Sequence, residues 1–281
     1  MRKHFLESLE REIDYNREYR KLEEMVINER VYRYNPYIRE SINMWIERYF
    51  RYWEKRNSFT SFSELREHLG FPVRKAAQNS WVMDADVIDI NGYFLYGEML
   101  LNIVDDLKEY LYSDIAGGID HVINTLRSNV ERAGFEIKKI DNEIMIVEKN
   151  SVAFEVADIV PDLSDVIIEY NHYLLKGDLG RKQEILKKLA DALEPKRQEL
   201  IAINKNMSND FFFMVNKMNV RHNNCDPSDT GKYCKQFAQL EPKEKEAWYD
   251  TIYEQGLALF VLLEQQERNK KISVFKASLG N

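Results

Sequence analysis

The sequence contains few of the residues that stabilise small secreted domains or bind nucleotides. Its 281 residues include 2 cysteines, 6 prolines and 11 glycines. Two cysteines, Cys225 and Cys234, imply no disulfide framework, and so little glycine and proline argues against sandwiches and barrels with many turns. The sequence also lacks glycine-rich nucleotide-binding motifs, the serine-hydrolase elbow and the His-Glu-x-x-His zinc motif. We therefore expect no cofactor.

Long apolar runs are also missing. The longest, 257–263, has seven residues, whereas a membrane-spanning helix needs about 20. The first residues, 1–7, become charged before any apolar stretch develops, which predicts that no secretory signal peptide is present. We expect a soluble, cytoplasmic protein that does not enter the membrane.

Excess positive charge is absent as well. Lys and Arg number 40 and Asp and Glu number 47, for a net charge of −7, so any nucleic-acid contact would need a local basic patch. One candidate is the segment 37–55, where basic residues surround an aromatic stripe. It could bind RNA through stacking and phosphate contacts. Interleaved glutamates favour the other interpretation, an amphipathic helix whose aromatic residues lie in the core.

The chain does contain helix-forming segments in quantity. Apolar residues recur at helical spacing, and helices are expected over 5–31, 37–55, 93–111 and 119–133. A short helix capped by Ser63 is expected within 57–80. Strand-like alternation occurs only in 135–140 and 143–148. Asp141 and Asn142 join these two runs, which predicts one β-hairpin packed against helices.

The last part of the chain is predicted to form four helices separated by turns and one loop. They are expected over 161–176, 178–193, 196–219 and 242–268, with a polar loop at 223–233. The predicted fold is mainly α: a helical N-terminal domain, 1–150, with one hairpin near 135–148, and a C-terminal four-helix domain, 151–281. The apolar surface of the C-terminal helices predicts a homodimer or a protein partner.

The most distinctive polar cluster follows the third of these helices. The apolar stripe from Leu200 to Met218 leads, if the helix continues one more turn, to Arg221 and His222. Two interpretations remain open. The two cations cap helix carbonyls at the negative end of the dipole, or His222 is a general acid/base and Arg221 stabilises charge on a phosphate.

Three features of the C-terminal part form a recognisable pattern: its four-helix layout, the block 219–224 and the segment Trp248-Tyr249-Asp250. In these features it resembles the HEPN superfamily, in particular HEPN-like domains of abortive-infection and toxin proteins. Catalytic members carry Arg, four to six residues and then His; here Arg221 and His222 are adjacent. The resemblance implies a dimeric, metal-independent endoribonuclease used in antiviral defence. Arg221 would grip the phosphate and His222 would deprotonate the ribose 2′-hydroxyl, assisted by Asn219 and Asn223.

The sequence leaves an alternative function and two possible metal sites to consider. The alternative function is a non-catalytic helical interaction or dimerisation subunit of a bacterial defence complex. His222, Cys225 and Cys234 could hold zinc, but only one tight ligand pair is present, so reduced and uninvolved thiols are preferred. In the N-terminal part, the acidic run Asp84, Asp86 and Asp89 could hold Mg²⁺, but the glycine and terminal glutamate of a calcium-binding loop are missing, so a solvated turn is preferred. RNA and a second copy of the chain are the expected partners.

Overall fold

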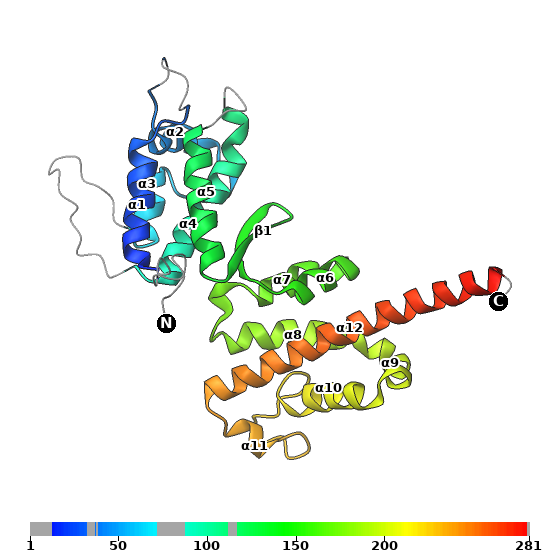
Figure 1. Ribbon diagram of the computed structural model, residues 1–281. Coiled ribbons are helices and arrows are strands. Elements are labelled where there is room, and N and C mark those ends of the chain that lie inside the picture. The colour runs from blue at the N-terminus through cyan, green and yellow to red at the C-terminus, as the bar shows by residue number, and fades with distance from the viewer. Residues whose placement is uncertain (1–12, 33–36, 38, 72–87, 112–116, 280–281) are drawn as a thin grey trace, which may run out of the picture. The chain divides into compact units, whose positions relative to one another are not determined.

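The computed structural model describes residues 13–32, 37, 39–71, 88–111 and 117–279. Within these residues the protein is mainly helical, with one antiparallel two-stranded hairpin, as the sequence predicts (Figure 1). The chain forms two compact units, Met1–Ile146 and Val147–Asn281.

In its described residues, the N-terminal unit is built on five α-helices. They are α1 (Tyr15–Asn28), α2 (Ile42–Tyr49), α3 (Phe62–His68), α4 (Ile90–Leu107) and α5 (Gly117–Arg132). Four of them begin at an Asp or Ser whose side chain accepts a backbone N–H of the first turn, namely Asp14, Ser41, Ser61 and Asp89. The predicted cap Ser63 is wrong, because the Ser63 hydroxyl donates to Glu47 instead.

The hairpin has the predicted boundaries, β1 (Phe135–Ile140) and β2 (Glu143–Glu148). Asp141 adopts a left-handed φ of 50° at the turn, a conformation that Asp tolerates. The side chain of Asn102 on α4 accepts from the Ile144 N–H at 2.9 Å and donates to the Ile144 carbonyl at 2.8 Å. The strand edge is thereby satisfied by a helix, which stabilises a hairpin that would be marginal alone.

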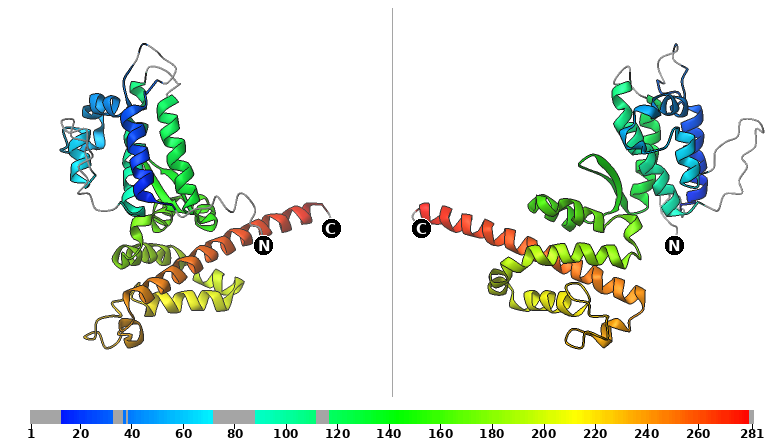
Figure 2. Two further views of the ribbon diagram at one scale, coloured as in Figure 1. Left: turned by 60° about the vertical axis from the view of Figure 1, so that its left-hand side comes forward. Right: turned by 180° about the vertical axis from the view of Figure 1, so that it is seen from behind.

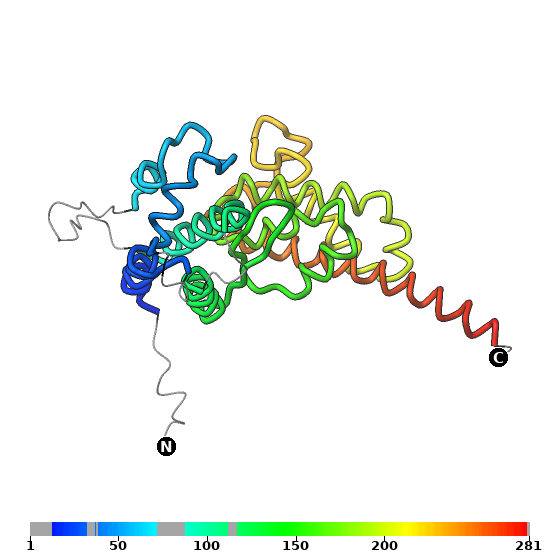
Figure 3. The backbone as a smooth tube through the Cα atoms, turned by 90° about the horizontal axis from the view of Figure 1, so that it is seen from above, coloured from blue at the N-terminus to red at the C-terminus, as the bar shows by residue number. Residues whose placement is uncertain are grey.

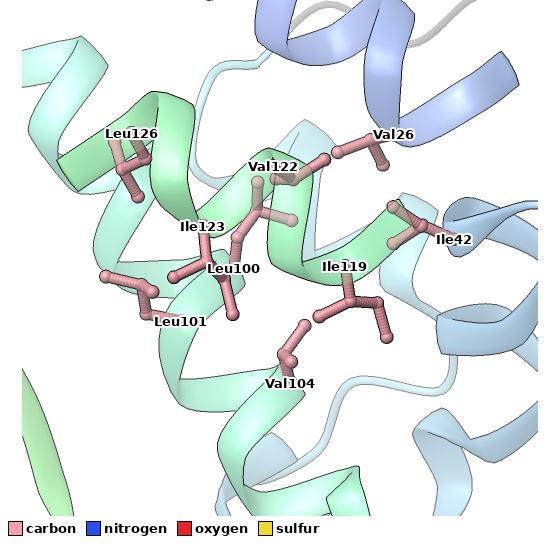
Figure 4. Close-up of a pocket in the computed structure, with 9 residues that line it drawn as sticks. All are labelled: Val26, Ile42, Leu100, Leu101, Val104, Ile119, Val122, Ile123 and Leu126. Carbon is pink, nitrogen blue, oxygen red and sulfur yellow. The ribbon is translucent and has the colours of Figure 1, made fainter. Parts of the chain in front are cut away.

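Helices α1, α2, α4 and α5 enclose a small apolar cavity (Figure 4). Its walls are aliphatic only: Val26, Ile42, Leu100, Leu101, Val104, Ile119, Val122, Ile123 and Leu126. A cavity without polar partners does not hold ordered water. We regard it as a packing gap of the core and assign it no ligand.

The start of α5 lies against the chain that follows α1. A Cβ atom added to Gly118 would lie 2.0 Å from the Arg30 carbonyl oxygen, and the Gly118 N–H faces the Val31 carbonyl at 3.4 Å. Only glycine permits this approach. Gly117 and Gly118 therefore begin α5, two residues before the predicted start at 119.

The C-terminal unit contains seven α-helices within the described residues. They are α6 (Ser151–Ile159), α7 (Ser164–Tyr170), α8 (Leu179–Leu193), α9 (Arg197–Ile203), α10 (Lys205–Lys217), α11 (Lys235–Ala238) and α12 (Pro242–Ser278). Helix α12 packs against α6, α8, α9 and α10, and so forms the centre of the unit. Its last turns extend past α8 and α10 in every view (Figures 2 and 3).

The predicted four-helix layout of the C-terminal domain is wrong, because the described residues of this unit form seven α-helices. Of the predicted helix 161–176, only Ser164–Tyr170 is α-helical, and two further predicted helices have different boundaries. The segment 196–219 is broken at Asn204, whose extended backbone ends α9 and whose side chain accepts from the Met207 N–H to begin α10. Helix α12 continues ten residues beyond the predicted end at 268 and reaches Ser278. Pro242 begins it at the first helical position, as predicted.

Candidate functional site

Helix α10 ends before it reaches Arg221 and His222. The Met218 N–H bonds to the Met214 carbonyl at 2.8 Å, and Asn219 then takes a left-handed φ of 61°. Asn is one of the residues that adopt this conformation at helix ends. The extra helical turn that would have carried the apolar stripe to Arg221 and His222 is therefore absent, and both residues lie in the following loop.

The Arg221 guanidinium is directed at the C-terminal end of α8. Nη2 donates to the Ala190 carbonyl at 2.7 Å and lies 3.6 Å from the Asp191 carboxylate, while Nη1 donates to Glu194. The Arg221 side chain is only 15 % exposed. A helix C-terminus is negative, and two carboxylates add to it, so the cation is held by its own protein.

The electrostatics of Glu194 agree with this arrangement. Partial burial alone would raise the pKa of Glu194, but the hydrogen bond and charge of Arg221, with a contribution from Arg197, lower it below its usual value. Glu194 is thus ionised at neutral pH. A phosphate that uses Arg221 would have to compete with this carboxylate.

His222 and Asn223 are accessible. His222 is half-buried and Asn223 is exposed, and neither side chain makes a hydrogen bond or ion pair within the described part of the chain. Their backbone carbonyls accept from Asn224 and Asp226. Arg221 and His222 are adjacent in sequence, but the structure contains no hydrogen bond between their side chains among the described residues.

Asn219, by contrast, holds the loop in place. Its N–H donates to Asn224 Oδ1 at 2.9 Å, its Oδ1 accepts from the Cys225 N–H at 3.3 Å, and its carbonyl accepts from Gln183. Burial raises the pKa of Tyr249 to about 12, although a hydrogen bond with the Asn219 side chain opposes the shift. The polar groups of Asn219 are thus occupied by structural contacts; its catalytic role stays a prediction.

Asn224 closes the loop that follows. Its side chain is 0 % exposed and donates to the Lys232 carbonyl at 2.5 Å, and its own carbonyl accepts from the Cys234 N–H at 2.8 Å.

No group of three His, Cys, Asp or Glu side chains that could hold a metal exists within the described residues. The zinc interpretation of His222, Cys225 and Cys234 therefore has no support.

A buried polar cluster that the sequence analysis missed joins α7, α8 and α12. Lys182 Nζ lies 2.7 Å from Asp250 and 2.9 Å from Glu246, and the Tyr170 hydroxyl donates to Asp250 at 2.9 Å. The Lys182 side chain is 8 % exposed. One signal existed in the sequence: Lys182 occupies a position of the apolar stripe of α8, where a cation requires partners.

The other sequence candidates lie elsewhere. Trp45 in the basic and aromatic segment is fully buried, and Arg48 and Lys55 form ion pairs with Glu40 and Asp106; these contacts agree with a core-forming helix. Asp89 caps α4, whereas Asp84 and Asp86 lie outside the described residues.

Comparisons with known proteins add no relative. No protein-family model matches the chain, and no curated protein and no solved structure is significantly similar to it. Every helix among the described residues is too short or too polar to span a lipid bilayer. Any functional conclusion therefore depends on the geometry described above.

Proposed function

We propose that the protein acts as a non-catalytic helical interaction module that associates with a second copy of itself through the final turns of α12. The observation that carries this proposal is the exposure of those turns. Residues 267–279 are all exposed, and four of them are large and apolar: Ile272, Val274, Phe275 and Leu279, with exposed fractions between 51 % and 71 %. Exposed apolar groups that gather in one place mark interaction surfaces.

Three of these residues share one face of the helix. Ile272, Phe275 and Leu279 follow the spacing i, i+3 and i+7, which aligns side chains along a helix. This is the pattern by which a helix anchors on a partner. We call this set the tail stripe. Val274 lies between these positions and points away from the tail stripe.

Charge along α12 favours an antiparallel pair. Glu264 and Glu267 precede the tail stripe, and one cation, Arg268, pairs with Glu264 there. Lys270 and Lys271 lie directly before the tail stripe and Lys276 lies within it. In an antiparallel pair the acidic part of one helix faces the basic part of the other, and in a parallel pair like charges would face each other. An antiparallel pair also places the tail stripe near the half-buried residues Val261 and Leu262 of the second copy.

Light scattering and sedimentation of the full chain test the proposal. We expect twice the mass of 33.4 kDa at micromolar concentration, and we expect Phe275→Asp to raise the dissociation constant at least 30-fold, as for an interface anchor worth about 2 kcal/mol. Phe213→Asp on α10 is the matched control, because Phe213 is 59 % exposed outside the tail stripe. A monomer at about 100 μM, or a dimer indifferent to Phe275→Asp, would contradict the proposal.

A second candidate, the endoribonuclease implied by the HEPN resemblance, is supported by the accessible imidazole of His222 beside Arg221. The test is RNA cleavage in the presence of a chelator, comparing wild type with His222→Ala. A general acid/base contributes about 10²–10⁴-fold to a rate, so His222→Ala should lose that factor, and Asn223→Ala should lose less. If wild type and His222→Ala are equally active or equally inert, the interaction module is the only remaining proposal.

A further inference from the structure

The loop after α10 brings the two cysteines together. Cys225 follows Asn224 directly, and the Asn224 carbonyl accepts the N–H of Cys234 at 2.8 Å. The two cysteine Cα atoms therefore lie on either side of one backbone hydrogen bond. Bridged cysteines have Cα atoms about 4.4–6.8 Å apart, and one hydrogen bond between neighbouring chain segments produces a separation of this order.

The position of this hydrogen bond is fixed by a buried group. Asn224 is fully buried, and its side chain joins the Asn219 N–H on one side of the loop to the Lys232 carbonyl on the other. The two ends of the segment 225–234 are thus held in register. An oxidant would meet cysteines whose backbones are already aligned.

The thiols themselves are available for this reaction. Both are free and half-buried. Burial raises the pKa of Cys225, Lys245 opposes this, and the nearby Cys234 raises it further. Cys225 is thus protonated at neutral pH, and the effect of Cys234 on it agrees with the proximity that the backbone imposes.

We propose that Cys225 and Cys234 form a reversible disulfide bond on reaction with a low-molecular-weight disulfide such as oxidised glutathione. Cys234 loses its proton to solvent and its sulfur attacks one glutathione sulfur; the glutathione S–S bond breaks, and one glutathione thiolate leaves and takes up a proton. Cys225 loses its proton to solvent and attacks the Cys234 sulfur, which releases the second glutathione. The two cysteines lose two electrons and two protons, and glutathione disulfide is reduced to two glutathione molecules.

The bond would lock the loop that carries His222 and Asn223. A cross-link removes loop-closure entropy from the unfolded chain. We expect the melting temperature of the oxidised protein to exceed that of the reduced protein by about 5 °C, and dithiothreitol to reverse the difference. This inference is independent of the tail stripe and of any activity.

Mass spectrometry of the full chain tests the proposal directly. After incubation with oxidised glutathione, the wild type should lose about 2 Da, and Cys225→Ser and Cys234→Ser should each gain about 305 Da by glutathionylation. Trypsin cleaves after Arg221, Lys232 and Lys235. A non-reducing digest should therefore contain the peptides 222–232 and 233–235 joined by one disulfide.

Two results would overturn the proposal of an internal Cys225–Cys234 disulfide bond. A wild type that gains about 610 Da without forming the linked peptides carries two glutathiones, which means that its thiols cannot reach each other. A linked peptide found only between two copies of the chain, seen as a covalent dimer on a non-reducing gel, would equally exclude the internal bond.

Discussion

Arg66→Met is expected to destabilise the N-terminal unit by about 3–5 kcal/mol, because it leaves a buried carboxylate without its cation. Arg66 Nη2 donates to Glu23 at 2.6 Å, and the two side chains are 3 % and 0 % exposed. The Tyr96 hydroxyl, also fully buried, donates to the other oxygen of Glu23. Helices α1, α3 and α4 thus meet at one ion pair that water cannot reach.

Hydrogen exchange of the full chain, measured in increasing urea, checks the expected loss of stability in Arg66→Met. Amides of α1 and α4 should exchange faster in Arg66→Met, and those of α8 and α10 serve as the internal reference. The double variant Glu23→Gln, Arg66→Met should recover most of the lost stability, because Gln removes the unpaired charge and still accepts from Tyr96. If the double variant is as unstable as Arg66→Met, the loss comes from packing and not from charge.

The second large effect is expected in the C-terminal unit. Lys182→Met should lower its stability by about 3 kcal/mol, because Glu246 and Asp250 would face each other without a cation. The cost is below that of a fully buried pair, because the Asp250 side chain is 47 % exposed. Arg181→Met is the matched control: Arg181 is the neighbouring cation on α8, and its side chain is 36 % exposed.

The effect of Lys182→Met should depend on pH. Partial burial would raise the pKa of Glu246, but the hydrogen bond and charge of Lys182, with the Gly177 N–H, lower it. A lowered pKa stabilises the folded state above the unfolded value of about 4.5, and this contribution is lost as pH falls through the folded pKa. The difference between wild type and Lys182→Met in urea unfolding should therefore be largest at pH 7 and shrink towards pH 3.5. A constant difference would mean that the pair is not the cause.

Local signals in the sequence predicted the local structure. The hairpin was predicted to the residue, because the alternation of 135–140 and 143–148 and the Asp141-Asn142 turn are all short-range features. Reliance on local periodicity also explains why the break at Asn204 was missed. Ile203 and Met207 continue the helical stripe across it, so the periodicity conceals a residue that caps the next helix with its own side chain.

The partners of the candidate site could not be predicted in this way. Arg221 pairs with Glu194 and the Ala190 carbonyl, 27 and 31 residues earlier in the chain. No spacing rule connects these positions, since it is the packing of α8 beside α10 that brings them together. The sequence suggested that Arg221 caps a helix, but the helix it caps is α8 and not its own.

The central position of α12 also has a consequence for synthesis. Helices α6, α8, α9 and α10 all leave the ribosome before α12, yet each of them packs on it. Until the buried residues between Tyr249 and Phe260 have been translated, the nascent C-terminal unit exposes the apolar faces that α12 will cover. Nascent chains in this state are substrates for chaperones. The N-terminal unit has its own core and can fold while the rest of the chain is still being made.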